Sequence, residues 1–289
     1  MPTISQAIIE GSRRLRAAGV DHDRLTAGLL LRHLIGVERT HLLTRSEEQI
    51  GADQYRDYLE LVERRAAGEP LQYVIGHQEF YELDFIVTPD VLIPRPETEF
   101  LIERVMKLAE ESERDSLLIV DVGTGSGCIA VTIAKLLPGA RLIATDVSPA
   151  ALTVAQRNAE RNRVRDRIEF LEGDLLEPLA ERGLQGAVDI LASNPPYVNQ
   201  VGRQLLQREV REWEPHEALF GGADGLDFYR RLLAETAPIL KPQGYLVLEI
   251  GFSQLEAISE IVSGSGLRLC DVTRDLQGIP RVLCLQRTV

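Results

Sequence analysis

Four consecutive residues offer a fixed pair of hydrogen-bond acceptors for a planar NH2 group. Asn194-Pro195-Pro196-Tyr197 follow the apolar run 188–193, which is typical of a buried parallel strand. The prolines fix φ and lack N–H donors, so the Asn194 side-chain oxygen and the Pro195 carbonyl stay available beside the Tyr197 ring. These acceptors suit an amide or an exocyclic amine. A tight turn with asparagine before proline explains the same residues, so the tetrapeptide alone leaves both interpretations open.

A second group of residues has the spacing of a nucleotide-binding loop. Asp121 lies near the end of a predicted strand, and the turn into the next helix reads Gly123-Thr124-Gly125-Ser126-Gly127. Glycines let the backbone approach a ligand closely and present its N–H groups. The following strand ends at Asp146, where a carboxylate can accept hydrogen bonds from ribose hydroxyls. We therefore predict a nucleotide site at the carboxyl edge of a parallel sheet.

The loop discriminates between two kinds of nucleotide. A dinucleotide fingerprint starting at Gly123 requires glycine at position 128, which is Cys128 here. The tighter loop suits an amino-acid moiety whose ammonium group pairs with Asp121. We expect S-adenosyl-L-methionine as cofactor, with S-adenosyl-L-homocysteine as product, rather than NAD. Asp174, after the third predicted strand, can reach the adenine amino group, although the pair Gly173-Asp174 is equally typical of a turn.

The elements that position these residues form two parts. Residues 1–75 have helical periodicity and predict a helical bundle that docks a partner. Residues 76–95 predict a linking β-hairpin with a turn near Glu82. Residues 96–289 alternate strands and helices, which predicts an α/β, Rossmann-like domain with a mostly parallel seven-stranded sheet and an antiparallel last strand.

Composition limits the function classes. The 289 residues are 44% hydrophobic and 26% charged, as in globular proteins, and carry a net charge of −12. That charge argues against direct nucleic-acid binding. No secretory signal or membrane span is visible, the three cysteines lack metal-like spacing, and the histidines of the helical part, His22, His33 and His41, are isolated. We expect a cytoplasmic, monomeric protein without a metal.

The motifs together resemble a known family. The loop from Asp121 to Gly127, Asp146 and the tetrapeptide at 194–197 resemble class I S-adenosylmethionine-dependent methyltransferases acting on a planar amide or amine. The helical front part and two further segments resemble the HemK-type (PrmC) peptide chain release factor glutamine methyltransferases. These segments are Pro94-Arg95-Pro96-Glu97-Thr98-Glu99 and Glu214-Pro215-His216-Glu217-Ala218-Leu219-Phe220-Gly221-Gly222. The resemblance covers nearly the whole chain. It departs at Trp213, where the family often has tyrosine.

This resemblance implies an activity in translation termination. The family methylates the side-chain nitrogen, N5, of the glutamine in the Gly-Gly-Gln motif of bacterial-type class 1 release factors. Asn194 and Pro195 would then grip the substrate amide, with Tyr197 over its plane and Pro196 beside it. Arg95 and Glu97 would form one wall of the site, and Leu175 would pack near the adenine. Glu97 and Glu99 also suit the first turn of a helix, so a capping role stays open.

Two other functions fit parts of the sequence. A methyltransferase acting on the N6 of adenine or the N2 of guanine in nucleic acid would use the same tetrapeptide, but the acidic charge disfavours it. A non-catalytic translation-factor binder could keep the cofactor pocket for structure alone. The two acceptors beside an intact glycine loop disfavour that alternative, since a binder has no use for them.

Overall fold

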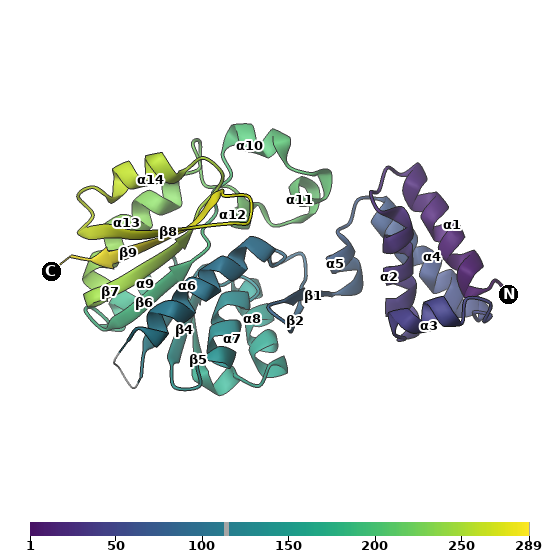
Figure 1. Ribbon diagram of the computed structural model, residues 1–289, viewed down its shortest axis with the longest axis horizontal. Coiled ribbons are helices and arrows are strands. Elements are labelled where there is room, and N and C mark those ends of the chain that lie inside the picture. The colour runs from purple at the N-terminus through teal and green to yellow at the C-terminus, as the bar shows by residue number, and fades with distance from the viewer. Residues whose placement is uncertain (113–115, 289) are drawn as a thin grey trace. The chain divides into compact units, whose positions relative to one another are not determined.

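The computed structural model describes residues 1–112 and 116–288 and divides into two compact units (Figure 1). Unit 1 comprises Met1–His77 together with Gln207–Trp213, and unit 2 comprises Gln78–Leu206 and Glu214–Val289. The sequence predicted a change of structure near residue 75, but gave no sign that residues 207–213 pack with the helical unit. None of the helices in the described residues is long and apolar enough to cross a bilayer.

Unit 1 is helical. Its helices are α1 (Ile4–Ala17), α2 (Asp23–Ile35), α3 (Arg39–Thr44), α4 (Ala52–Ala66), α5 (Leu71–Ile75) and α11 (Arg208–Trp213). Thr3 caps α1 in a capping box with Gln6, and α2 ends at Gly36 in the left-handed region. The short helix α5 was not predicted, because its five residues follow Pro70 with too little length for a periodic pattern.

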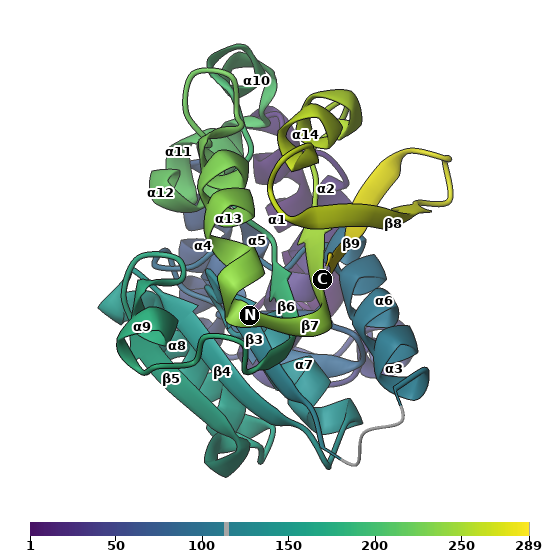
Figure 2. The same ribbon diagram turned by 90° about the vertical axis from the view of Figure 1, so that its left-hand side faces the viewer.

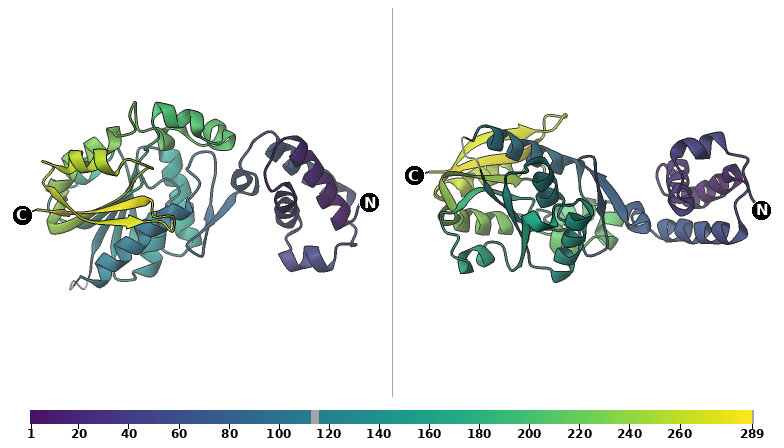
Figure 3. Two further views of the ribbon diagram at one scale, coloured as in Figure 1. Left: turned by 45° about the horizontal axis from the view of Figure 1, so that its top comes forward. Right: turned by 90° about the horizontal axis from the view of Figure 1, so that it is seen from below.

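The core of unit 1 lies between α1, α2 and α4, drawn in purple and dark blue in Figure 3. It contains Leu15, Leu30 and Tyr58, each fully buried. Tyr58 donates its hydroxyl to the Ala27 carbonyl at 3.3 Å, so the buried phenol has a partner. Segment 207–213 joins this unit through an ion pair of 2.5 Å between Glu209 and Arg65.

Unit 2 begins with a hairpin. Its strands are β1 (His77–Phe80), of which His77 is the last residue of unit 1, and β2 (Leu83–Ile86). Tyr81 and Glu82 have φ values of 50° and 59°, the two consecutive positive values that a tight two-residue hairpin turn requires. Phe80 and Phe85 pack edge to face at 6.0 Å. The predicted hairpin and its turn are confirmed.

A seven-stranded sheet forms the centre of unit 2, with strand order β5-β4-β3-β6-β7-β9-β8. The strands are β3 (Leu118–Val122), β4 (Arg141–Asp146), β5 (Ile168–Glu172), β6 (Val188–Ser193), β7 (Leu240–Glu249), β8 (Leu267–Arg274) and β9 (Pro280–Arg287). Neighbouring strands from β5 to β7 are parallel, and β9 runs antiparallel to β7 and β8. The predicted fold class is confirmed.

Helices cover both faces of this sheet (Figure 2). The chain contributes α6 (Glu99–Glu110), α7 (Cys128–Leu136), α8 (Pro149–Arg161), α9 (Glu177–Glu181), α10 (Gln200–Leu205), α12 (His216–Leu219), α13 (Asp227–Ile239) and α14 (Leu255–Val262). Side chains from α6, α7 and α8 pack on one face, and side chains from α9, α13 and α14 on the other. Successive strand residues alternate between the two cores, for example Ile119 and Val120.

Strand β7 begins at Leu240, five residues before the apolar run that starts at Tyr245. The register between β6 and β7 shifts between Val188 and Ile190, so the first part of β7 pairs irregularly. An added Cβ at Gly244 would lie 2.9 Å from the Lys241 carbonyl, which shows how tightly the backbone bends there. An alternating hydrophobic pattern cannot reveal such a strand, because a bulge interrupts the period of two.

Candidate active site

Strands β3, β4, β6 and β7 end at one edge of the sheet, and the predicted site residues follow those ends. Asn194 leaves β6 directly after Ser193, which pairs with Leu248 of β7. Ser193 donates its hydroxyl to the Val122 carbonyl at 2.7 Å and so fixes the end of β6 against β3. The tetrapeptide therefore starts from a rigid position, with Pro195 buried and the other three residues half-buried.

Three glycines press against the tetrapeptide loop. A Cβ at Gly221 would lie 2.5 Å from the Pro196 carbonyl oxygen, and a Cβ at Gly225 would lie 2.4 Å from that of Tyr197. A Cβ at Gly251 would lie 2.8 Å from the Tyr197 ring. Real Cβ atoms do not approach other atoms so closely, so these positions need glycine for space. The loop is held in one conformation by backbone that surrounds it.

The NH2 group of the Asn194 carboxamide is hydrogen-bonded within the protein, whereas its oxygen is an unused acceptor among the described residues. Its Nδ2 donates to the hydroxyl of Thr98 at 3.2 Å, and that hydroxyl donates to Glu249 Oε2 at 2.7 Å. Within residues 1–112 and 116–288, no hydrogen bond reaches Asn194 Oδ1 or the Pro195 carbonyl. The two acceptors predicted to grip a substrate amide are thus both unused in the protein itself.

Glu249 is the last residue of β7 and is 2% exposed. Burial raises the pKa of this carboxyl to about 7, and the charge of Glu97 raises it further, whereas hydrogen bonds from Thr98 and Asn194 and the charge of Arg281 lower it. Sequence reasoning missed Glu249 and the hydroxyl of Thr98. The only available signal was a glutamate at the end of an otherwise apolar strand.

The glycine loop lies between β3 and α7, as predicted. Gly123, Gly125 and Gly127 have φ values of 72°, 53° and 80°, where side chains other than glycine are strained. A Cβ would meet no protein atom within 4 Å at Gly123 or Gly125, so the backbone there borders open space. At Gly127 it would meet Ala155 at 3.0 Å, which brings α8 close to the loop. The first two glycines face space that a ligand can fill.

Asp121 is fully buried beneath this loop. Its Oδ2 accepts hydrogen bonds from the Thr124 hydroxyl at 2.6 Å and from the Ala130 N–H at 3.1 Å. Its Oδ1 is buried with no partner in the described part of the chain. Burial raises the pKa of Asp121 to about 7, those two hydrogen bonds lower it, and the charge of Asp146 raises it. An unpaired buried oxygen fits a ligand's ammonium group.

Asp146 ends β4 and lies half-buried at the same edge. Its Oδ2 accepts from the Gly125 N–H at 2.8 Å, and its Oδ1 accepts from the Ser148 N–H at 2.9 Å. Each oxygen keeps lone-pair capacity for ribose hydroxyls. Burial raises the pKa of Asp146, while these backbone hydrogen bonds lower it.

Two polar residues of the loop are buried within it. Thr124 donates to Asp121, and the Ser126 carbonyl accepts from the Asn158 side chain at 2.8 Å. Asn158 also exchanges two hydrogen bonds with Ile86, at 2.7 and 2.9 Å, so α8 connects the glycine loop to the end of the hairpin. Asn158 was not singled out from the sequence, since an asparagine in a helix carries no distinctive pattern.

Asp174 and Leu175 follow β5. The Asp174 carboxylate pairs with Arg231 at 2.6 Å, with both side chains over 40% exposed. Leu175 has a φ of 47°, packs against the apolar core and accepts a hydrogen bond from Thr145 through its carbonyl. Since Arg231 occupies one Asp174 oxygen, an adenine contact by this residue stays a prediction.

The segment before α6 is attached to a residue far along the chain. Arg95 pairs with the buried carboxylate of Glu214 at 2.5 Å, and that carboxylate also accepts from the Ile93 N–H at 3.3 Å. Glu97 lies 3.8 Å from Arg281 with its side chain 41% exposed. Glu99 accepts from the Tyr81 N–H at 3.1 Å, which ties α6 to the hairpin. Of the two glutamates, Glu97 has the longer and partly exposed contact, and its role toward a substrate stays a prediction.

Tyr197 is half-buried, and burial raises the pKa of its phenol. Its carbonyl accepts from Gln254 Nε2 at 3.1 Å, and Gln254 Oε1 accepts from the Gly251 N–H at 2.9 Å. Gln254 therefore fastens the tetrapeptide to the segment between β7 and α14. No local pattern around Gln254 indicates this role.

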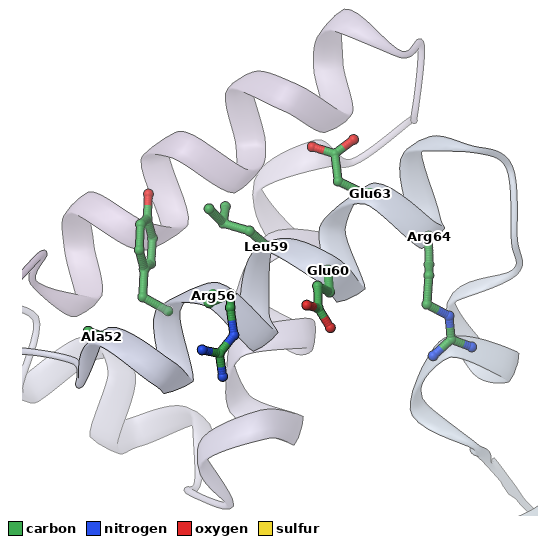
Figure 4. Close-up of a pocket in the computed structure, with 7 residues that line it drawn as sticks. Ala52, Arg56, Leu59, Glu60, Glu63 and Arg64 are labelled. Atoms are coloured by element: carbon green, nitrogen blue, oxygen red, sulfur yellow. The ribbon is translucent and has the colours of Figure 1, made fainter.

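Metal-binding groups and surface pockets add nothing to this site in the described residues. No group of three or more His, Cys, Asp or Glu side chains in the described residues could hold a metal. A surface pocket of about 490 Å³ lies along α4 in unit 1 (Figure 4). It is lined by Ala52, Tyr55, Arg56, Leu59, Glu60, Glu63 and Arg64. Its residues come from a single helix, and none belongs to the predicted site.

The seven-stranded sheet has a Rossmann-like fold, and the matching family model identifies the class as methyltransferases. Residues 96–212 match the family model described as methyltransferase small domain, and residues 6–76 match the PrmC N-terminal domain. A methyltransferase structure from Pyrococcus furiosus has a TM-score of 0.53 over 81% of this chain and 98% of that chain. At 20% identity it shows likeness of fold alone.

Sequence relatives narrow the class. The chain is 45% identical to the release factor glutamine methyltransferase of Koribacter versatilis over 281 residues, 97% of each chain. It is 47% identical to that of Moorella thermoacetica over 264 residues, 91% of each chain. The chain belongs to the release factor glutamine methyltransferase family. The resemblance found from the motifs is therefore confirmed.

Proposed function

We propose that the protein transfers a methyl group from S-adenosyl-L-methionine to the side-chain nitrogen of the glutamine in the Gly-Gly-Gln motif of class 1 release factors. One observation carries the chemical part: Asn194 Oδ1 and the Pro195 carbonyl are unused acceptors on a rigid loop at the ligand-binding edge of the sheet. The named relatives support the choice of substrate.

The residues around the glycine loop fit the cofactor. Asp121 Oδ1 would accept the ammonium group, the open backbone at Gly123 and Gly125 would border the amino-acid moiety, and Asp146 would accept the ribose hydroxyls. Asp174 and Leu175 would contribute to the adenine side. When bound, the cofactor supplies an electrophilic methyl group on a sulfonium sulfur.

The protein's part in the reaction is alignment. The amide nitrogen is a weak nucleophile because its lone pair is delocalised into the carbonyl. Two fixed acceptors, one on Asn194 and one on Pro195, hold the two N–H bonds and direct the nitrogen at the methyl carbon. Full preorganisation of this kind contributes at most about 7–11 kcal/mol to lowering a barrier. The acceptors also stabilise the positive charge that develops on nitrogen, and the proton then leaves to water.

Four further residues border the substrate in this proposal. Tyr197 covers the amide plane, and Pro196 limits the approach beside it. Arg95 belongs to the loop before α6, and its ion pair with Glu214 orients the guanidinium. Glu97, which is partly exposed, completes that wall.

The partner is a protein rather than a nucleic acid. A net charge of −12 disfavours a polyanion, and the relatives are named for release factors. We propose that the enzyme acts as a cytoplasmic monomer, with the helical unit 1 docking the release factor.

Mass spectrometry of a co-expressed release factor tests this function. One added methyl on the Gly-Gly-Gln glutamine is expected with the wild-type enzyme and none with Asn194→Ala. Incubation with labelled cofactor and either release factor, ribosomal RNA or DNA provides the comparison. Label in a nucleic acid and not in the protein would refute the proposal, as would cofactor binding without transfer to any Gly-Gly-Gln protein.

A further inference from the structure

Three residues from three separate elements form a hydrogen-bonded chain behind the proposed substrate site. Glu249 ends β7, Thr98 lies just before α6, and Asn194 follows β6. The Thr98 hydroxyl donates to Glu249 at 2.7 Å, and Asn194 Nδ2 donates to the Thr98 oxygen at 3.2 Å. Thr98 and Glu249 are each 2% exposed, so water does not compete for these bonds.

The direction of these bonds determines which side of the Asn194 carboxamide faces outward. A hydroxyl has one proton, and Thr98 gives its proton to the carboxylate of Glu249. Its oxygen can then only accept, so Asn194 must turn its NH2 group inward. The Asn194 oxygen is left on the outer side, where no hydrogen bond from the described residues reaches it.

We propose that Thr98 and Glu249 are positioning residues that orient the Asn194 carboxamide, so that its oxygen and not its NH2 group meets the substrate amide. This inference rests on the proposed function, because an outward acceptor matters only to a substrate that brings N–H donors. If the carboxamide were reversed, the Asn194 NH2 group would face the N–H donors of the substrate amide. The hydrogen bond that holds the substrate nitrogen would then be lost.

The ionisation state of Glu249 determines the direction of the hydrogen bonds that run from Asn194 through Thr98 to Glu249. A protonated Glu249 can donate to the Thr98 oxygen, which frees the hydroxyl proton to donate to Asn194 and allows the carboxamide to turn over. Titratable groups on several neighbouring elements interact electrostatically with Glu249. The facing titratable groups are Glu97 before α6, Arg281 of β9, Tyr197 of the tetrapeptide, Tyr229 of α13 and Cys128 of α7.

This arrangement makes turnover depend on pH in a defined direction. Burial raises the Glu249 pKa to about 7, so the carboxyl is substantially protonated below neutrality. At saturating cofactor and substrate, kcat should rise with pH through this region and level off above it. Below the pKa, it should fall by up to about tenfold per pH unit.

Kinetics of isosteric variants of the full chain test the positioning role. Thr98→Val keeps the shape but removes the hydroxyl, and Glu249→Gln presents an NH2 group to Thr98. Both should lower kcat at pH 8 by about tenfold or more and leave the Kd for S-adenosyl-L-homocysteine within about twofold. Thr98→Ser should recover part of the loss. The matched control is Thr236→Val, another fully buried threonine, whose hydroxyl bonds within α13; it should turn over like wild type.

Two results distinguish positioning from simple structural support. Glu249→Gln should lose the rise of kcat around pH 7. Thr98→Val should have little further effect in an Asn194→Ala background, about twofold or less, since both changes remove the same interaction. Wild-type turnover in Thr98→Val, an unchanged pH profile in Glu249→Gln, or additive losses in the double variant would each overturn the inference.

A measurement without turnover separates this inference from the proposed function. In protein labelled with ¹⁵N-asparagine, the Asn194 side-chain signal is identified by its loss in Asn194→Ala. It should shift with pH near neutrality in wild type and stay constant in Glu249→Gln or Thr98→Val. A signal that ignores pH in wild type refutes the positioning role. If it shifts while no release factor is methylated, the orienting chain stands and the substrate assignment fails.

Discussion

Asp146 accepts a hydrogen bond from the backbone N–H of Gly125 at 2.8 Å, across 21 residues of sequence. This bond ties the glycine loop after β3 to the end of β4. Under the proposed function the same carboxylate would accept the ribose hydroxyls, so the geometry of the loop and the affinity for the cofactor would depend on one side chain.

Asp146→Ala should weaken cofactor binding, because it removes both the ribose acceptor and the tie to Gly125. A hydrogen bond to a charged acceptor contributes about 1.5–3 kcal/mol, which corresponds to an increase in Kd of roughly 10- to 150-fold. Calorimetric titration with S-adenosyl-L-homocysteine measures it. Asp166→Ala changes an exposed acid of the same unit and should bind normally. An unaltered Kd in Asp146→Ala would remove this residue from the site.

Cofactor affinity should depend on pH through Asp121. Its pKa is raised to about 7 in the ligand-free protein, and only the ionised form attracts an ammonium group. Affinity should therefore rise with pH between about 5.5 and 7.5, by up to about tenfold per unit below the pKa. Titrations of wild type and Asp121→Asn across this range check it, and the slope should be absent in the variant. Equal slopes in the two proteins would contradict an ammonium contact.

Gly221→Ala should damage the tetrapeptide loop by steric clash alone. The added Cβ would lie 2.5 Å from the Pro196 carbonyl oxygen. Relief of this clash requires a shift of the backbone at Gly221 or at Pro196, which costs more than a side-chain rotation. Overpacking of this kind costs about 1–3 kcal/mol of stability, and displacement of Pro195 and Asn194 should lower kcat more than cofactor affinity. Urea unfolding and kinetics measure the two effects.

Gly28→Ala is the control for that substitution. Gly28 lies inside α2 with no atom within 4 Å of an added Cβ, so alanine should be neutral or stabilising by about 0.5–1 kcal/mol. If Gly221→Ala behaves like Gly28→Ala, the loop has more freedom than the contacts indicate.

The parts of the site that the sequence revealed are those fixed by local chemistry. The glycine loop, Asp146 and the tetrapeptide follow strand ends, and the topology of a parallel sheet brings strand ends to one edge. The sequence did not predict the roles of three residues, because these roles arise from contacts between distant segments. The residues are Thr98, Glu249 and Gln254. Thr98 and Glu249 are 151 residues apart, and no local pattern encodes such a pair.

The same distinction holds for the fold. The alternation of strands and helices predicted the sheet. Helices α1 and α8 begin at residues whose caps are local in sequence, because Thr3 accepts from the Gln6 N–H and Ser148 from the Ala151 N–H. Short helices such as α5 and α9 have five residues each, too few for a periodic signal. The packing of segment 207–213 with unit 1 depends on a tertiary ion pair that no sequence pattern shows.

Arg95 and Glu214 should prove energetically coupled. Glu214 is 3% exposed and lies 2.5 Å from Arg95. Glu214→Ala removes the carboxylate that pairs with the guanidinium, and Arg95→Ala removes the cation that pairs with a buried carboxylate. A double-mutant cycle followed by urea unfolding should give a coupling of about 0.5–3 kcal/mol. The exposed pair Arg230 and Asp224 should couple weakly, since solvent screens it.

In turnover assays, Arg95→Ala and Glu214→Ala should each raise KM for the release factor and leave the cofactor Kd unchanged. A normal KM together with lowered stability would restrict the pair to holding the loop before α6 in place.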